Sequence, residues 1–277
     1  MITPDNPYYR QVRLLVRVLP DVAAEQCFAL KGGTAINLFL RDLPRLSVDI
    51  DLSYLPIEDF ERSQAEIDAA LRRIRDRLTS GSPAHRVTEG AARGSGLIDT
   101  LSVSDGSQRI KIEVNPVLRG AVHDPAPLTL RPAAEAEFGF AQITTLAFED
   151  IYAGKLMAAL DRQHPRDLFD VMILLENEGI SDAMFRTWLA YLVGHKGSMA
   201  DALAPNRKDI RTLFQDQFAA MTEREVSLEQ LLDVRERLIA EIHGRLGERE
   251  KIFLLSVKRG EPQWELLGLE GSSGYPR

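Results

Sequence analysis

The hydrophobic positions in the first third of the chain follow the spacing of amphipathic helices. One helix is predicted over residues 8–26, with an apolar face formed by Val12, Leu15, Val18 and Leu19. A second is predicted over 57–79 and ends at the Ser-Gly-Ser-Pro breaker. Between them, a short apolar segment leads into a Lys-Gly-Gly-Thr turn, and residues 35–43 again have helical composition.

Alternating polar and apolar residues predict strands. From Ser47 onward, Ser47, Asp49 and Asp51 would point to one side, and Val48, Ile50 and Leu52 to the other. Two further strands, 97–103 and 109–114, flank a Ser-Asp-Gly sequence typical of a hairpin turn. The second of these places Lys111 and Glu113 on one face.

The pattern changes after a proline-rich connection at 116–132. From Phe148 to about Leu246 it is helical, with interruptions at Pro165, Gly179 and 194–197. We therefore expect an α+β fold. Residues 1–145 would form an α/β domain with a mixed sheet, 146–270 a helical domain, and 271–277 a flexible tail.

Composition narrows the class of protein. The 277 residues are 44% hydrophobic and 27% charged, as in ordinary globular proteins, and no apolar run approaches the roughly 20 residues of a membrane span. The N-terminus lacks the layout of a signal peptide. A single cysteine, Cys27, excludes an internal disulfide, and the five histidines lack the spacing of a structural zinc site. We expect a cytoplasmic protein that does not bind membranes.

The charge distribution allows two interpretations. The net charge of −7 argues against a surface that is basic throughout. Within 62–119, however, ten Lys/Arg stand against seven Asp/Glu, a local balance of +3. A solvated helix face is the favoured interpretation of this stretch, and an RNA-binding patch is the other.

The residues suited to chemistry lie in the glycine turn and the aspartate strand. Backbone N–H groups of Gly32 and Gly33 at the start of a helix could approach phosphates, and the hydroxyls of Thr34 and Ser47 are further nucleotide-binding candidates. Fourteen residues after Thr34 come Asp49 and Asp51, whose carboxylates could converge on Mg²⁺. Each signal alone is common in turns and on surfaces. Their order along the chain favours a nucleotide site.

Two more groups have both a functional and a structural interpretation. Glu113 could be a third metal ligand, or it could pair with Lys111. Lys155 lies among small and apolar residues and could hold a triphosphate, or it could pair with a core carboxylate. Asp167 and Asp170 could likewise act in the site or form a local ion pair.

Several of these segments together resemble a known family. FALKGGTAINLFL, RLSVDIDLSY, KIEVNPV, EDIYAGKLMAAL and PRDLFDV, with IFLLSVKRGEPQWELLGL near the end, are similar to AbiEii/AbiGii-type nucleotidyltransferases. These are toxin components of bacterial toxin–antitoxin systems. The resemblance covers about residues 25–270 and implies a polymerase-β-like nucleotidyltransferase fold with a helical C-terminal part.

The resemblance also implies roles. Gly33 and Thr34 match the phosphate-holding turn, and Asp49 and Asp51 the metal ligands. Lys155 would hold the triphosphate, and Asp170 would orient Lys155 or the acceptor hydroxyl, with Asp167 as the alternative. Such proteins use an NTP, and some modify the 3′ end of tRNA to stop translation.

Three functions follow as hypotheses. The leading one is a Mg²⁺-dependent toxin that adds nucleotides to RNA and is controlled by a cognate antitoxin. The second keeps the chemistry and replaces RNA with a protein or small-molecule acceptor, which the acidic net charge favours. The third is a non-catalytic NTP-binding regulator, against which the intact Asp49, Asp51 and Lys155 argue.

Overall fold

The chain forms two compact units, and the computed structural model describes residues 4–81, 85–91 and 96–269. The first unit contains the chain up to Ala147 together with Ala220–Arg224. The second contains Phe148–Ala219 and, among the described residues, 225–269. The predicted tail, 271–277, lies outside the described residues. No helix in the described part of the chain is long and apolar enough to cross a membrane.

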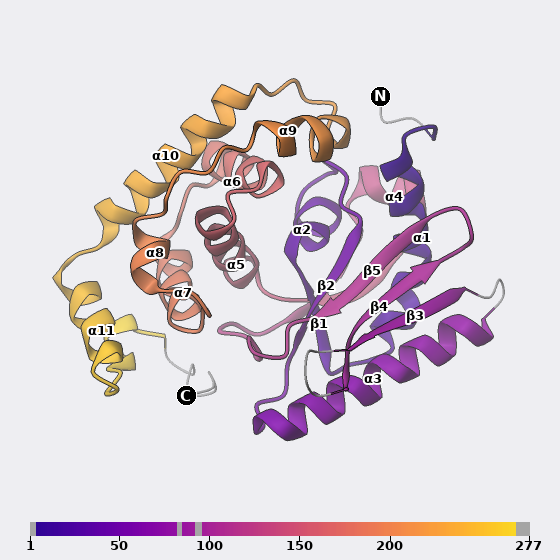
Figure 1. The fold of residues 1–277 in the computed structure, drawn as a ribbon, viewed down its shortest axis with the longest axis horizontal. Helices are drawn as coiled ribbons and strands as arrows, with labels where there is room; N and C mark the ends of the chain where they lie inside the picture. Colours follow the sequence, from indigo (N-terminus) through magenta and orange to yellow (C-terminus); the bar gives the residue numbers. More distant parts are fainter. Residues whose placement is uncertain (1–3, 82–84, 92–95, 270–277) are drawn as a thin grey trace. The chain divides into compact units, whose positions relative to one another are not determined.

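The first unit is built on a seven-stranded sheet (Figure 1). The strands lie in the order β3-β4-β5-β2-β1-β7-β6. The β1/β7 and β2/β5 pairs are parallel and the other pairs antiparallel, so the predicted mixed sheet is confirmed. The strand bounds are β1 Phe28–Lys31, β2 Asp49–Tyr54, β3 Arg86–Ala91, β4 Ile98–Ser104, β5 Arg109–Val114, β6 Ala126–Thr129 and β7 Gln142–Thr145.

The helices of this unit include the two that the sequence predicts. α1 (Pro7–Ala23) begins after Asn6, whose side chain accepts the N–H of Tyr8 at 2.9 Å. α3 (Phe60–Ser80) begins after the cap Asp59, three residues later than the predicted start. The remaining helical segments are α2 (Gly32–Thr34), the π-helix η1 (Ala35–Leu40) that continues it, and α4 (Pro132–Phe138).

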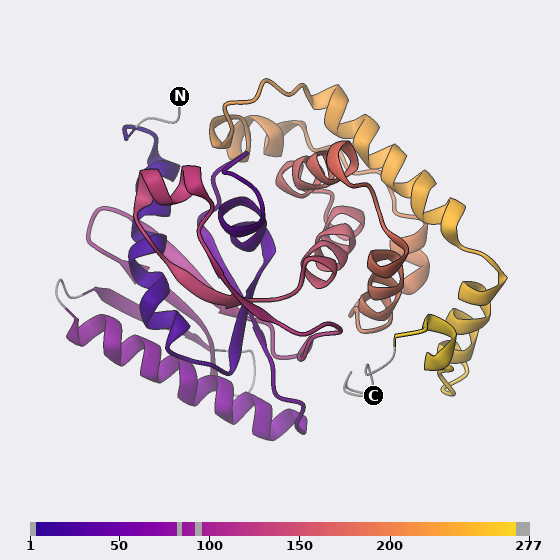
Figure 2. The same ribbon diagram turned by 180° about the vertical axis from the view of Figure 1, so that it is seen from behind.

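One face of the sheet is apolar and covered. Ile50, Leu101 and Ile112 are fully buried on this face, and α1 and α3 pack against its strands. α1 passes behind the strands in Figure 1 and in front of them in Figure 2. The alternation predicted from the sequence therefore separates a covered apolar face from a polar one.

Four elements were not expected from the sequence. β3 has few apolar residues and lies at one edge of the sheet, while β6 lies at the other edge and contains Pro127, a residue that edge strands tolerate. β7 has a single pair with β1, between Thr145 and Leu30. β6 lies within residues 116–132, where the sequence predicts only a connection, and α4 and β7 come after it.

The second unit is helical. Its helices are α5 (Phe148–Asp161), α6 (Pro165–Asn177), α7 (Asp182–Val193), α8 (Met199–Leu203), α9 (Arg211–Gln217), α10 (Leu228–Arg245) and α11 (Glu248–Lys258), followed by a 3-10 turn, η3 (Trp264–Leu267). Another 3-10 turn, η2 (Ala219–Met221), lies where the chain passes to the first unit. Trp188, Tyr152 and Phe169 are among the largest fully buried side chains.

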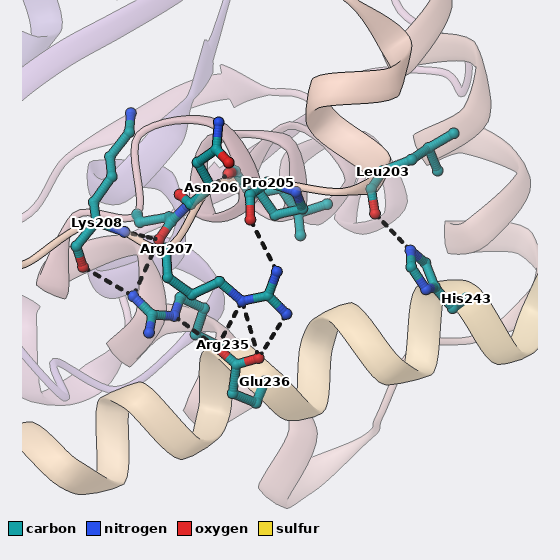
Figure 3. A network of polar contacts seen from close by, with 10 residues as sticks. Leu203, Pro205, Asn206, Arg207, Lys208, Arg235, Glu236 and His243 are labelled. Carbon is teal, nitrogen blue, oxygen red and sulfur yellow. Dashed lines mark hydrogen bonds and ion pairs between the residues drawn. The ribbon is translucent and has the colours of Figure 1, made fainter.

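A polar network joins α10 to the segment after α8 (Figure 3). Arg207 donates to Glu236 at 2.8 Å, and Arg235 donates to the carbonyl of Lys208 at 3.0 Å. Arg235 also donates to Oε1 of Gln163, a fully buried side chain that in turn donates to the carbonyl of Asn206. The network therefore holds Gln163 in place, two residues before α6 begins.

We predict that the ion pairs of Glu25 contribute to the stability of the first unit. Its buried carboxylate accepts from Arg73 and Arg77 of α3 at 2.7–3.1 Å. Burial raises the pKa of Glu25, but the two guanidinium groups outweigh it, and the net pKa is lowered. The stabilisation is therefore present above the ordinary pKa of a glutamate and is lost as the pH falls through the lowered value.

Glu25→Gln should accordingly reduce the free energy of unfolding by about 1 kcal/mol at neutral pH, since Arg73 is half exposed. Urea titrations from pH 7 to pH 3 measure this difference. A deficit that is equally large at pH 3 would contradict the ionic origin of the effect.

Candidate active site

Asp49 and Asp51 lie on the polar face of β2. In the parallel pairing with β5, Asp49 lies opposite Lys111 and Asp51 opposite Glu113. Ile50, between the two aspartates, is fully buried on the other face. The shared orientation of the two carboxylates, which alternation predicts, is confirmed, and residues two apart on a strand are separated by about 6.6 Å along it.

The glycine turn contacts this pair directly. Gly32 has a positive φ of 71°, and a Cβ at this position would overlap Oδ2 of Asp51. A Cβ on Gly33 would lie 2.8 Å from both the Arg45 guanidinium and Oγ of Ser47. A Cβ at either position would therefore displace a neighbouring side chain, and the two glycines of the motif have separate contacts.

Thr34 and Ser47 hold the strand in place. Thr34 is fully buried, its hydroxyl donates to the carbonyl oxygen of Asp49 at 2.5 Å, and it hydrogen-bonds Oγ of Ser47 at 3.1 Å. The side-chain amide of Asn37 donates to the carbonyl of Gly33 at 2.9 Å. In the structure these hydroxyls connect the turn to β2, which fixes the backbone from which Asp49 projects.

Lys31 was not among the residues selected from the sequence. It is paired with Asp51 across the β1/β2 ladder, so its side chain shares the face of the two aspartates. Burial lowers the pKa of Lys31, and the nearby Asp51 carboxylate opposes this effect. The sequence feature that indicates Lys31 as a site residue is its position directly before the glycine pair, at the end of an apolar strand.

Glu113 shares the row of Asp51 and also pairs with Lys111. Their ion pair joins Oε1 and Nζ, and both side chains are partly exposed. The hydrogen bond that Lys111 donates to Glu113 raises the pKa of Lys111; burial lowers it, and the charges of Asp49 and Asp51 raise it further. The structure thus places Glu113 beside the aspartates, as an ion-pair partner of Lys111. This position is also compatible with a metal ligand.

The donor set suits Mg²⁺. Proteins commonly hold this ion with one or two carboxylates and leave its other positions to water and substrate phosphates. Asp49 and Asp51 supply two such carboxylates from one strand. Among the described residues, no group of three His, Cys, Asp or Glu is arranged to hold a metal ion. Two carboxylates on one strand therefore fit the share of Mg²⁺ ligands that a protein commonly supplies.

Lys155, in the second unit, is almost fully buried on α5. Its ammonium lies 3.0 Å from Oδ1 of Asp167 and 2.9 Å from Oδ2 of Asp170, both on α6. Arg162 also donates to both oxygens of Asp167, at 2.6 and 2.9 Å. Burial raises the pKa of Asp167, but Lys155 and Arg162 outweigh this and lower it well below its usual range. Both candidate aspartates thus contact the lysine.

The start of α6 is fixed by several contacts. Gln163 has a φ of 54°, a left-handed conformation that is uncommon for residues other than glycine, and its side chain is bound by the network of Figure 3. His164 caps the helix by accepting the N–H of Arg166 at 3.1 Å. Asp167 follows within the first turn of the helix, where its dipole favours negative charge, and Asp170 lies one turn later.

Comparisons with known proteins give a family and a solved structure of similar fold. A family model described as the nucleotidyl transferase AbiEii toxin of type IV toxin–antitoxin systems matches residues 13–266. Among solved structures, the chain is similar to MenT4, a nucleotidyltransferase toxin from Mycobacterium tuberculosis H37Rv. The identity is 15% and the TM-score 0.70, over 96% of this chain and 94% of that one. No curated protein matched the sequence.

We predict that Gly32→Ala weakens Mg²⁺ binding by displacing the Asp51 carboxylate. Gly179→Ala is the matched control, because Gly179 has nearly the same φ, 72°, with open space where a Cβ would be. Both variants should lose about 1–2 kcal/mol of stability through the strained backbone. Calorimetric titration with Mg²⁺ should show weaker binding for Gly32→Ala alone. Equal affinities in the two variants would contradict the contact with Asp51.

Lys155→Met should destabilise the second unit by about 3–5 kcal/mol, because it leaves buried carboxylates without their ammonium. The deficit should shrink as the pH falls, since protonation removes the uncompensated charge. Lys251→Met, at an exposed surface pair with Glu248, is the control and should change stability by less than about 0.5 kcal/mol. Denaturant unfolding measures both. A loss below 1 kcal/mol for Lys155→Met would contradict the role of the ammonium.

Proposed function

Because the chain belongs to the AbiEii family of nucleotidyl transferase toxins of type IV toxin–antitoxin systems, we propose that it transfers a nucleotide from an NTP to RNA. The proposed acceptor is the 3′ end of tRNA. The observation that carries the proposal is the contact between the glycine turn and the Asp49/Asp51 strand, which joins a phosphate-binding element to two carboxylates. A cognate antitoxin would restrain this activity in the cell.

Each residue of the first unit has a task in this proposal. Asp49 and Asp51 would hold Mg²⁺, which when bound neutralises charge on the triphosphate and on the reacting oxygens. Backbone N–H groups of Gly32 and Gly33, at the start of the α2/η1 helix, would donate to phosphate oxygens. Lys31 would add positive charge on the face of Asp51. Thr34 and Ser47 would fix the geometry of Asp49 through the hydrogen bonds described above.

The reaction needs no covalent intermediate on the protein. The acceptor hydroxyl would attack the α-phosphorus, and pyrophosphate would leave from the opposite side. Charge neutralisation and positioning then provide most of the acceleration. This suits a site whose polar groups are carboxylates, a lysine and backbone amides.

The roles of Glu113, Lys155 and Asp170 are further parts of the proposal. Glu113 would exchange Lys111 for the metal, which its partial exposure permits. Lys155 would bind the triphosphate, and to do so it would give up part of its contact with Asp167 and Asp170. Asp170 would orient the ammonium of Lys155. Asp167, which Arg162 also holds, fits a structural task better.

A second candidate keeps the chemistry and changes the acceptor. The net charge of −7 favours a protein or small molecule over RNA. A regulator that only binds NTP is the third candidate, and two adjacent metal-ligand carboxylates are more than such a protein needs.

We predict that Asp49→Ala lowers nucleotide transfer by at least about a hundredfold, because one metal ligand is lost. Stability should change little, since Asp51 remains and a neighbouring like charge is removed. Purified wild-type and variant proteins are incubated with total RNA, Mg²⁺ and each labelled NTP in turn. Expression of the wild type without an antitoxin should arrest growth, and the variant should not.

Two results would count against this function. Harmless expression of a demonstrably active enzyme would remove the toxin role. Label on protein rather than RNA would move the chemistry to the second candidate.

A further inference from the structure

The cationic stretch 62–119 separates into two groups of side chains in the structure. All five arginines of α3 contact carboxylates: Arg62 contacts Glu58, Arg72 contacts Asp68, Arg73 and Arg77 contact Glu25, and Arg75 contacts Asp76 and Glu89. Arg119 is buried and donates to Ser63. The charge of this helix is therefore balanced locally, which agrees with a solvated helix face. Arg93 lies outside the described residues.

The second group lies on the polar face of the sheet. Arg86 of β3 and Arg109 of β5 are both paired with Ser104 of the intervening β4, so all three share one row. In the next row, Lys111 is paired with Ser102 on one side and with Asp49 on the other. The three cations are exposed. The second row leads from the edge of the sheet to the aspartates.

The rest of this face is small or hydroxylic, apart from Glu113 of β5, which pairs with Lys111. In the paired register Ser104 lies between Arg86 and Arg109, Ser102 lies between Thr88 and Lys111, and Gly90 lies opposite Thr100. None of the described residues on this face of β3, β4 and β5 is aromatic. α1 and α3 pack on the opposite, apolar face, and Figure 1 shows the three strands lying in front of α1.

We propose that this face of β3, β4 and β5 binds the sugar–phosphate backbone of the acceptor RNA and leads its 3′ end to Asp49 and Asp51. The inference rests on the proposed function and adds the surface that receives the acceptor. Arg and Lys side chains, together with Ser and Thr hydroxyls, are the usual donors to phosphate and sugar oxygens. Adjacent strands are about 4.8 Å apart, so the surface extends about 14 Å from β2 to the edge strand β3.

The composition of the surface also defines the kind of contact. Proteins that select bases in single-stranded RNA stack them on aromatic side chains. Without such side chains, this face would position the acceptor through its backbone and would be tolerant of sequence. At the acidic end of the face, bound Mg²⁺ would offset the negative charge of both the Asp49 and Asp51 carboxylates and the reacting phosphates.

The test compares two double variants with the same change in charge. Arg86→Gln/Arg109→Gln removes both exposed arginines from the proposed surface. Arg13→Gln/Arg17→Gln removes two exposed arginines from α1, which packs on the opposite face of the sheet. Circular dichroism and thermal unfolding establish that both variants fold. Transfer to bulk tRNA is measured with labelled NTP at several salt concentrations, and NTP binding is measured without RNA.

The surface variant should raise the KM for tRNA by about tenfold, the order expected from losing two exposed charge contacts with phosphate. Its kcat and its affinity for NTP should equal those of the wild type. The salt dependence of log K for tRNA should become shallower by about 1.4, or 0.7 for each lost contact with a single strand. The α1 variant should match the wild type in every measurement.

Three other outcomes would each overturn the inference, and the measurements distinguish them from one another. If the wild type labels tRNA and both variants behave alike, the surface is wrong and the proposed function stands. If the wild type labels protein and not RNA, the proposed function fails and the surface assignment fails with it. If the surface variant labels tRNA normally but escapes an antitoxin, the face serves a protein partner instead.

Discussion

The close approach of Gly32 to Asp51 is the constraint on which the candidate site depends. A side chain at position 32 would occupy the place of the Asp51 carboxylate, and its φ of 71° would be strained in any other residue. Gly33 is packed in the same way against Arg45 and Ser47, and the hydroxyl of Thr34 links the turn to β2 through its bond to the carbonyl of Asp49. The glycine turn and the carboxylates are thus in direct contact, which is the kind of fixed positioning that the proposed reaction requires.

The second unit meets a different constraint, the burial of charge. Lys155, Asp167 and Asp170 are almost fully buried, and Arg162 supplies a second positive charge. Two cations and two carboxylates balance, so the cluster is stable where any one of the three buried charges alone would be costly. The left-handed Gln163, bound on several sides, fixes the start of the helix that carries both aspartates.

Much of this could be predicted from the sequence, and the reasons are local. The alternation from Ser47 onward predicts which face carries Asp49 and Asp51, because strand geometry allows only two faces. The Ser-Asp-Gly turn is confirmed, since Asp105 accepts the N–H groups of Ser107 and Gln108 between β4 and β5. The burial of Lys155 among apolar residues is also confirmed. In each case a short segment contains the whole signal.

The rest depends on pairings between distant segments. The role of Ala220–Arg224 in the first unit appears only in contacts such as the N–H of Leu46 with the carbonyl of Met221, at 2.7 Å. Lys31 becomes a candidate only through its pairing with Asp51 across the β1/β2 ladder. The arginines of α3 and those of β3 and β5 look alike in sequence, and only tertiary contacts show which have carboxylate partners.

The central claim is that the site transfers a nucleotide rather than a terminal phosphate. Two labels on the same NTP, one at the α-phosphorus and one at the γ-phosphorus, test it most directly in a reaction with Mg²⁺ and total RNA. Nucleotidyl transfer predicts that the α label joins the RNA while the γ label leaves in pyrophosphate. Retention of the γ label on the acceptor, without the α label, would contradict the account.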